Sequence, residues 1–203
     1  MLLLDATKLI LNYYNKKDMS VNAPNDKLGW KASNFNLLNI DKKNYSLDAL
    51  KGENGTVIAF ICNHCPYVIA IAKRLSFEAN ELKKLNINTI CIMSNDQNQY
   101  PEDSFENMIK FAKKFDFKFP YLYDETQNIA RQFGAVCTPD IFGFDKNLIL
   151  QYRGRLDSGV INSKEKKIER ELYNSMIEIK KNNIAPGKQY NSFGCSIKWK
   201  DNE

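Results

Sequence analysis

The sequence contains little cysteine and almost no histidine. Among 203 residues there are five cysteines, and His64 is the only histidine. Five cysteines in a chain of this length are too few for a scaffold built on disulfide bonds. No hydrophobic run approaches the roughly 18 residues of a membrane-spanning helix, so we expect no membrane partner. The N-terminal stretch also lacks the positive charge and small-residue cleavage site of a secretory signal, which predicts a cytoplasmic protein.

The length and the 43% hydrophobic content predict one globular domain with a core of its own. We expect residues 1–28 to form an N-terminal extension and residues 29–203 the single domain. Residues 1–14 have the pattern of a short amphipathic helix, interrupted by Asp5. A second interpretation is that translation starts at Met19 rather than Met1.

The net charge of +5 comes from 29 basic and 24 acidic side chains. The lysines are scattered, with short pairs such as Lys83-Lys84 beside acids, and no basic stripe alternates with aromatic residues. This pattern is typical of a solvated surface, so we expect no nucleic-acid partner.

Hydrophobic periodicity predicts alternating strands and helices. Two short strands surround the turn Asp41–Asn44, and the buried strands and their helices follow. We expect further strands at 56–61, 89–93, 121–123, 140–144 and 148–152, and helices at 66–85, 103–115, 126–133 and 164–181. The polar C-terminal tail, residues 182–203, is expected to run over the surface. The fold class is therefore α/β, a mixed central sheet flanked by helices.

The only close cysteine pair, Cys62-Asn63-His64-Cys65, joins the strand at 56–61 to the following helix. A Cys-x-x-Cys at such a junction is typical of a thioredoxin-like redox site. The helix N-terminus stabilises a thiolate, and the second thiol can release a substrate from a mixed disulfide. His64 can add positive charge or a hydrogen bond to the ionised sulfur.

Pro66 indicates which cysteine attacks. Proline is favoured at the first position of a helix, which makes Cys65 the N-cap and places its sulfur at the helix dipole. The alternative register would put Pro66 at the fourth helical position and remove a backbone hydrogen bond. We therefore predict that Cys65 is the thiolate and Cys62 the resolving thiol.

Other interpretations of the pair stay open at this point. Cys62 and Cys65 can be half of a zinc site or a purely structural pair. With Cys91 in an apolar strand and His64 as the sole histidine, further zinc ligands are scarce, so we expect no metal and no cofactor.

Cys137-Thr138-Pro139 precedes the hairpin at 140–152, and we predict that Pro139 is a cis-proline facing the redox helix. Cys137 and Cys195 are candidate accessory thiols, although each can equally be a passive packed residue.

Several segments together resemble one family. They are F-I-C-N-H-C-P-Y-V, I-M-S-N-D, Y-P-E-D-S-F, F-P-Y-L-Y-D-E-T, G-A-V-C-T-P-D and G-C-S-I-K-W. In these segments the chain, from about Gly29 to Trp199, resembles the peroxiredoxin-like (AhpC/TSA, redoxin) branch of the thioredoxin superfamily. The resemblance implies a thioredoxin-like fold with an added N-terminal β-hairpin, and a redox-active thiol.

The sequence departs from the peroxiredoxin pattern at two places. The threonine expected three residues before the attacking cysteine is Cys62, and the position of the expected arginine is occupied by Pro139. Peroxide reduction needs groups that stabilise its transition state, whereas disulfide exchange needs a thiolate and a partner thiol. We predict a thiol–disulfide oxidoreductase, with thiol peroxidase and non-catalytic redox sensor or binding module as alternatives. Its partners would be a protein or small-molecule disulfide or a peroxide, and a thiol electron donor that the sequence does not identify.

Overall fold

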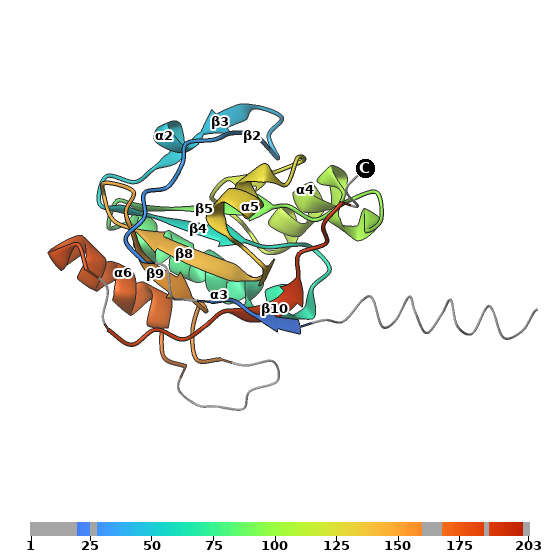
Figure 1. The fold of residues 1–203 in the computed structure, drawn as a ribbon. Coiled ribbons are helices and arrows are strands. Elements are labelled where there is room, and N and C mark those ends of the chain that lie inside the picture. Colours follow the sequence, from blue (N-terminus) through green and yellow to red (C-terminus); the bar gives the residue numbers. More distant parts are fainter. Residues whose placement is uncertain (1–19, 25–27, 160–167, 185–186, 201–203) are drawn as a thin grey trace, which may run out of the picture.

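The computed structural model describes residues 20–24, 28–159, 168–184 and 187–200. A seven-stranded sheet in the order β3-β2-β6-β5-β4-β8-β9 forms its centre (Figure 1). Its strands are β2 (Asn36–Asn39), β3 (Asn44–Ser46), β4 (Gly55–Phe60), β5 (Ile87–Met93), β6 (Tyr121–Tyr123), β8 (Asp140–Phe144) and β9 (Leu150–Gly154). The helices are α2 (Leu47–Leu50), α3 (Pro66–Lys83), the 3-10 helix η1 (Pro101–Asp103), α4 (Phe105–Lys114), α5 (Asn128–Phe133) and α6 (Glu171–Asn182).

The sheet is mixed, as predicted. Strands β4, β5 and β6 are parallel, and the neighbouring pairs on both sides are antiparallel. Every residue of β4 is buried because helices cover both faces of the sheet. Val57 and Ala59 pack with α3, α4 and α6, whereas Ile58 and Phe60 pack with α5. The predicted N-terminal hairpin is present as β2 and β3.

A second, three-stranded sheet joins the two ends of the described chain. Strand β10 (Phe193–Ser196) pairs antiparallel with both β1 (Ser20–Asn22) and β7 (Cys137–Thr138). The expectation that the C-terminal tail runs over the surface is therefore wrong for this part of it. Cys195 and Ile197 are buried, since the strand's hydrogen bonds and its apolar side chains fix it to the domain.

All four predicted helices are shorter in the structure: α3 ends at Lys83 rather than 85, and α5 begins at Asn128 rather than 126. The helix expected from 103 begins only at Phe105, because Ser104 caps it by accepting a hydrogen bond from the Asn107 N–H, while Asp103 ends η1. The last helix begins at Glu171 rather than 164, where Leu172 and the residues one turn on start to pack on the sheet. Residues 164–167 and the helix expected at 1–14 lie outside the described residues. Among the helices that are described, none is long and apolar enough to cross a membrane.

Candidate active site

Cys62 and Cys65 lie between the end of the central strand, β4, and the start of α3, the longest of the described helices. Ile61 still donates a backbone hydrogen bond to Ile92, and the chain then leaves the sheet. Cys65 is the N-cap of α3, with an extended backbone, and Pro66 is the first helical residue. The helix register predicted from Pro66 is confirmed.

Thr138 and Pro139 face the two cysteines from the end of β7. The Thr138–Pro139 peptide bond is cis, as predicted. The Thr138 hydroxyl lies 3.2 Å from Cys62 Sγ, and its carbonyl oxygen lies 3.2 Å from Cys65 Sγ. One residue from another part of the chain thus contacts both thiols of the pair.

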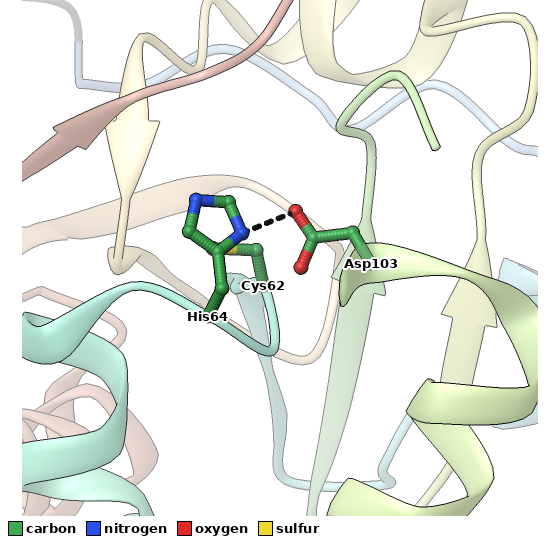
Figure 2. A group of neighbouring side chains, drawn as sticks. All are labelled: Cys62, His64 and Asp103. Atoms are coloured by element: carbon green, nitrogen blue, oxygen red, sulfur yellow. Dashed lines mark ion pairs between the residues drawn. The ribbon is translucent and has the colours of Figure 1, made fainter. Parts of the chain in front are cut away.

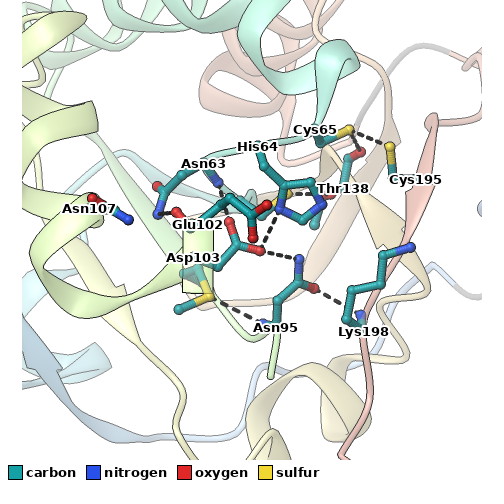
Figure 3. A network of polar contacts seen from close by, with 12 residues as sticks. Asn63, His64, Cys65, Asn95, Glu102, Asp103, Asn107, Thr138, Cys195 and Lys198 are labelled. Carbon is teal, nitrogen blue, oxygen red and sulfur yellow. Dashed lines mark hydrogen bonds and ion pairs between the residues drawn. The ribbon is translucent and has the colours of Figure 1, made fainter. Parts of the chain in front are cut away.

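Cys195 completes a group of three sulfurs at this place (Figure 3). Its register in β10 sets it opposite Thr138, and its Sγ lies 2.8 Å from Cys65 Sγ. Cys62 and Cys65 have no exposed surface, and Cys195 is 3% exposed. All three sulfurs are thus buried, and the five cysteines of the chain are free in this structure.

The surroundings push the pKa values of Cys62 and Cys65 in opposite directions. The pKa of Cys65 is lowered because the side chains of Cys195 and Cys62 donate hydrogen bonds to the thiolate, helped by the backbone N–H groups of Cys195 and Val68. Burial opposes this lowering of the Cys65 pKa. The Thr138 carbonyl also opposes it, because a carbonyl accepts a hydrogen bond from the Cys65 thiol but not from its thiolate. Neither effect outweighs the lowering. Burial raises the pKa of Cys62, and Cys65 and the Asp103 charge add to that increase. The reduced site therefore holds a thiolate at Cys65 and a thiol at Cys62.

A buried carboxylate holds the histidine of the motif (Figure 2). His64 Nδ1 lies 2.8 Å from Oδ2 of Asp103, whose side chain is fully buried. Burial alone would lower the pKa of His64, but the hydrogen bond and charge of Asp103 outweigh it, and the pKa is raised. The nearby Cys65 and Glu102 charges act in the same direction. His64, close to the Cys65 sulfur, is therefore protonated more readily than an ordinary histidine.

Asp103 is itself fixed by amide donors. Its Oδ1 accepts the backbone N–H of Asn63 at 2.8 Å, and its Oδ2 accepts the side-chain amide of Asn95 at 2.7 Å. Asp103 is a site residue that the sequence pattern did not predict, although it lies in the segment Y-P-E-D-S-F. The available signal was an acid directly before a serine that can cap a helix.

Cys62, His64 and Asp103 also present three potential metal-ligating atoms within 4.8 Å of one another. These donor types suit zinc. However, both oxygens of Asp103 already accept N–H groups, and Cys62 Sγ contacts the Thr138 hydroxyl. We therefore assign the three groups to tuning the thiols rather than to metal ligation.

The remaining two cysteines differ from the cluster. Cys91 is a fully buried residue of the hydrophobic core, as predicted, and burial raises its pKa. Cys137 lies in β7, where burial also raises its pKa and its thiol donates to the Pro139 carbonyl at 3.5 Å. A thiol that burial keeps protonated is a weaker nucleophile than a thiolate, so Cys137 is not the attacking thiol of the site.

Comparison with known proteins places this site in a family context. The sequence model of the AhpC/TSA family matches residues 28–153. A crystal structure of an uncharacterized conserved protein from Geobacillus kaustophilus is 40% identical, with a TM-score of 0.87 over 92% of this chain and 99% of that one. A hypothetical protein from Sinorhizobium meliloti is 29% identical, with a TM-score of 0.85 over 89% and 99% of the two chains.

More distant structures share the fold alone. The peroxidoxin BcpB from Mycobacterium tuberculosis is 20% identical, with a TM-score of 0.52 over 61% of this chain and 82% of that one. The comparison with curated proteins gives no match.

Proposed function

Because the chain belongs to the AhpC/TSA family of thioredoxin-like redox proteins, we propose that it is a thiol–disulfide oxidoreductase in which Cys65 attacks and Cys62 resolves. The observation that carries this proposal is the opposite shift of the two pKa values within one Cys-x-x-Cys motif. A thiolate is the attacking species in disulfide exchange, and Cys65 is the thiol that its surroundings ionise.

In the first step, the Cys65 thiolate attacks one sulfur of a substrate disulfide. A new S–S bond forms between Cys65 and that sulfur, the substrate S–S bond breaks, and the second substrate sulfur leaves with the electron pair. In the second step, the Cys62 sulfur attacks Cys65 Sγ and displaces the first substrate sulfur. The Cys62 proton goes to one leaving thiolate, and the other takes a proton from water, so the substrate is reduced to two thiols and the protein is oxidised to a Cys62–Cys65 disulfide.

The neighbouring groups support these steps through charge and contact. Imidazolium at His64, held by Asp103, favours negative charge on the adjacent sulfurs. The hydroxyl of Thr138 contacts Cys62 Sγ and lowers the pKa of that thiol against the effect of burial, which assists its later attack. Pro66 sets the register of the helix, and Pro139 borders the cysteines beside Thr138.

As part of this proposal, the physiological partners are a disulfide or peroxide and a separate thiol that reduces the protein again. We place the protein in the cytoplasm, because a chain with few cysteines that works through thiols suits a reducing compartment.

A thiol peroxidase is the second candidate, and the closed site favours it. Cys65 has no exposed surface, so a molecule as small as a peroxide reaches it more readily than a protein does. Against this candidate, the arginine side chains are engaged by other groups, so none of them takes the place of the arginine that the peroxiredoxin pattern has where this chain has Pro139. Arg74 pairs with Asp157, Arg153 with Asp140, Arg155 with Glu171 and Arg170 with Glu78, and Arg131 stacks on Trp199.

Stopped-flow oxidation separates the candidates. Reduced protein is mixed with oxidised glutathione or with hydrogen peroxide, and the products are identified by mass spectrometry after an acid quench. We expect rapid reaction with the disulfide, lost in Cys65→Ser and retained in the control Cys91→Ala, which removes a core thiol. Peroxide oxidation no faster than that of free cysteine eliminates the peroxidase. If the protein reacts with neither oxidant, both the oxidoreductase and the peroxidase are excluded, and a redox sensor or binding module remains.

A further inference from the structure

We propose that Cys195 is a second resolving thiol, which forms a disulfide with Cys65 in competition with Cys62. This inference rests on the proposed function, since it requires Cys65 to attack the substrate first. It assigns a redox step to the C-terminal strand β10, beyond the Cys-x-x-Cys motif.

The sulfur of Cys195 lies in contact with the attacking sulfur. The two Sγ atoms are 2.8 Å apart, and this contact is the largest cause of the lowered pKa of Cys65 (Figure 3). Cys62 also interacts with Cys65, but its Sγ lies 3.2 Å from the Thr138 hydroxyl as well, and the charge of Asp103 opposes its ionisation. Both candidate resolving thiols therefore interact with Cys65, and the contact of Cys195 with Cys65 Sγ, at 2.8 Å, places it as a second thiol that can reach Cys65 without rearrangement.

The strand that carries Cys195 is fixed on both sides of that residue. Before it, the Ser192 hydroxyl donates to the Gly154 carbonyl at 2.6 Å, and the Ser192 carbonyl accepts the Ala23 N–H at 2.9 Å. After it, the Ile197 N–H donates to the Val136 carbonyl at 3.0 Å. Holding two reacting groups in a fixed geometry speeds their reaction, so this anchoring favours exchange between the two sulfurs.

Gly194 permits the close approach of β10 to the site. A Cβ added at Gly194 would collide with the Thr138 carbonyl oxygen and would lie 2.6 Å from the Thr138 carbonyl carbon. Contacts this short with backbone atoms force the strand to move. Only glycine lets the neighbouring Cys195 sit opposite Thr138 in the observed register.

The proposed step is an ordinary thiol–disulfide exchange. When Cys65 is joined to half of the substrate, the Cys195 sulfur attacks Cys65 Sγ. The Cys65–Cys195 bond forms, the bond from Cys65 to the substrate breaks, and the substrate sulfur leaves with the electron pair. The proton of the Cys195 thiol passes to that leaving thiolate, and the oxidant is the substrate disulfide itself.

Single-turnover reaction with oxidised glutathione, followed by disulfide mapping, tests the proposal. In Cys62→Ser, we expect glutathione to be released and a Cys65–Cys195 disulfide to form. In the Cys62→Ser, Cys195→Ser double variant, release is lost and Cys65 stays glutathionylated. Adding Gly194→Ala to Cys62→Ser should slow the release, whereas adding the control Gly187→Ala should not, because a Cβ at Gly187 meets no atom within 4 Å.

The outcomes separate this inference from the proposed function. If Cys62→Ser stops at glutathionylated Cys65, or pairs Cys65 with a cysteine other than Cys195, the inference is wrong while the attack by Cys65 stands. If Cys65 forms neither a mixed disulfide with glutathione nor a disulfide with another cysteine in the double variant, the proposed function itself fails.

Discussion

Replacing Asp103 with asparagine should reverse the direction in which the pKa of His64 is shifted. In the wild-type protein the carboxylate raises the pKa of His64 above its usual 6.5, in spite of burial. The asparagine side chain would be close in shape to the aspartate and would keep an oxygen for the Asn63 N–H, but it would carry no charge. With the charge removed, burial dominates and the pKa of His64 should fall below 6.5.

The size of this change follows from the geometry. His64 Nδ1 lies 2.8 Å from the fully buried carboxylate, and the imidazole side chain is only 15% exposed. An opposite charge within about 4–6 Å shifts a pKa by about 1–3 units, which is about 1.4–4 kcal/mol of free energy. A raised pKa stabilises the fold fully below the unfolded value of about 6.5, and the contribution is lost as the pH rises through the folded value. The Asp103→Asn variant should lack this loss of stability as the pH rises above 6.5.

Proton NMR measures the effect directly, because His64 is the only histidine of the chain and its imidazole signals need no assignment. Glu102→Gln is the matched control. Glu102 is exposed and contributes the last of the causes that raise the pKa of His64, so its variant should shift that pKa much less. An unchanged His64 pKa in folded Asp103→Asn would refute the assigned role of Asp103.

Two further predictions concern the thiolate and the packing of the fold. The ultraviolet absorbance of reduced protein should show one thiolate at about pH 6, below the usual cysteine pKa of about 8.5. This signal should disappear in Cys65→Ser but not in Cys137→Ser, and its persistence in Cys65→Ser would assign the thiolate to another residue. Gly52→Ala should lower the free energy of unfolding by about 1–3 kcal/mol or more in a denaturant titration, since its Cβ would lie 2.6 Å from the Asn86 carbonyl oxygen. Gly187→Ala should change it by less than about 0.5 kcal/mol, and equal effects of the two substitutions would contradict the packing at Gly52.

The sequence was sufficient to predict the parts of the site that local rules determine. Pro66 after Cys65 sets the helix register, because a proline without an N–H belongs at the first helical position. The continuous apolar run of β4 identified the central strand, since a strand covered on both faces needs no polar alternation. These features depend on residues that are neighbours in the chain.

The features that the sequence left open depend on tertiary contacts. Asp103 lies far from His64 in the chain, and a predicted helix beginning at Asp103 concealed the turn that aims its carboxylate at the imidazole. Cys195 was a candidate thiol in a tail expected at the surface, and only the pairing of β10 with β7 brings its sulfur to Cys65. No local propensity of a short polar segment specifies which strand it will pair with.

The most direct test of the account is the order in which the cysteines are alkylated. Reduced wild-type protein is treated briefly with iodoacetamide at about pH 6, where an ordinary thiol is protonated, and each cysteine is quantified by peptide mass spectrometry. We expect Cys65 to be labelled first, ahead of Cys62, because the pKa of Cys65 is lowered whereas that of Cys62 is raised. Preferential labelling of Cys62 would contradict the assignment and reverse the roles of the two cysteines in the motif.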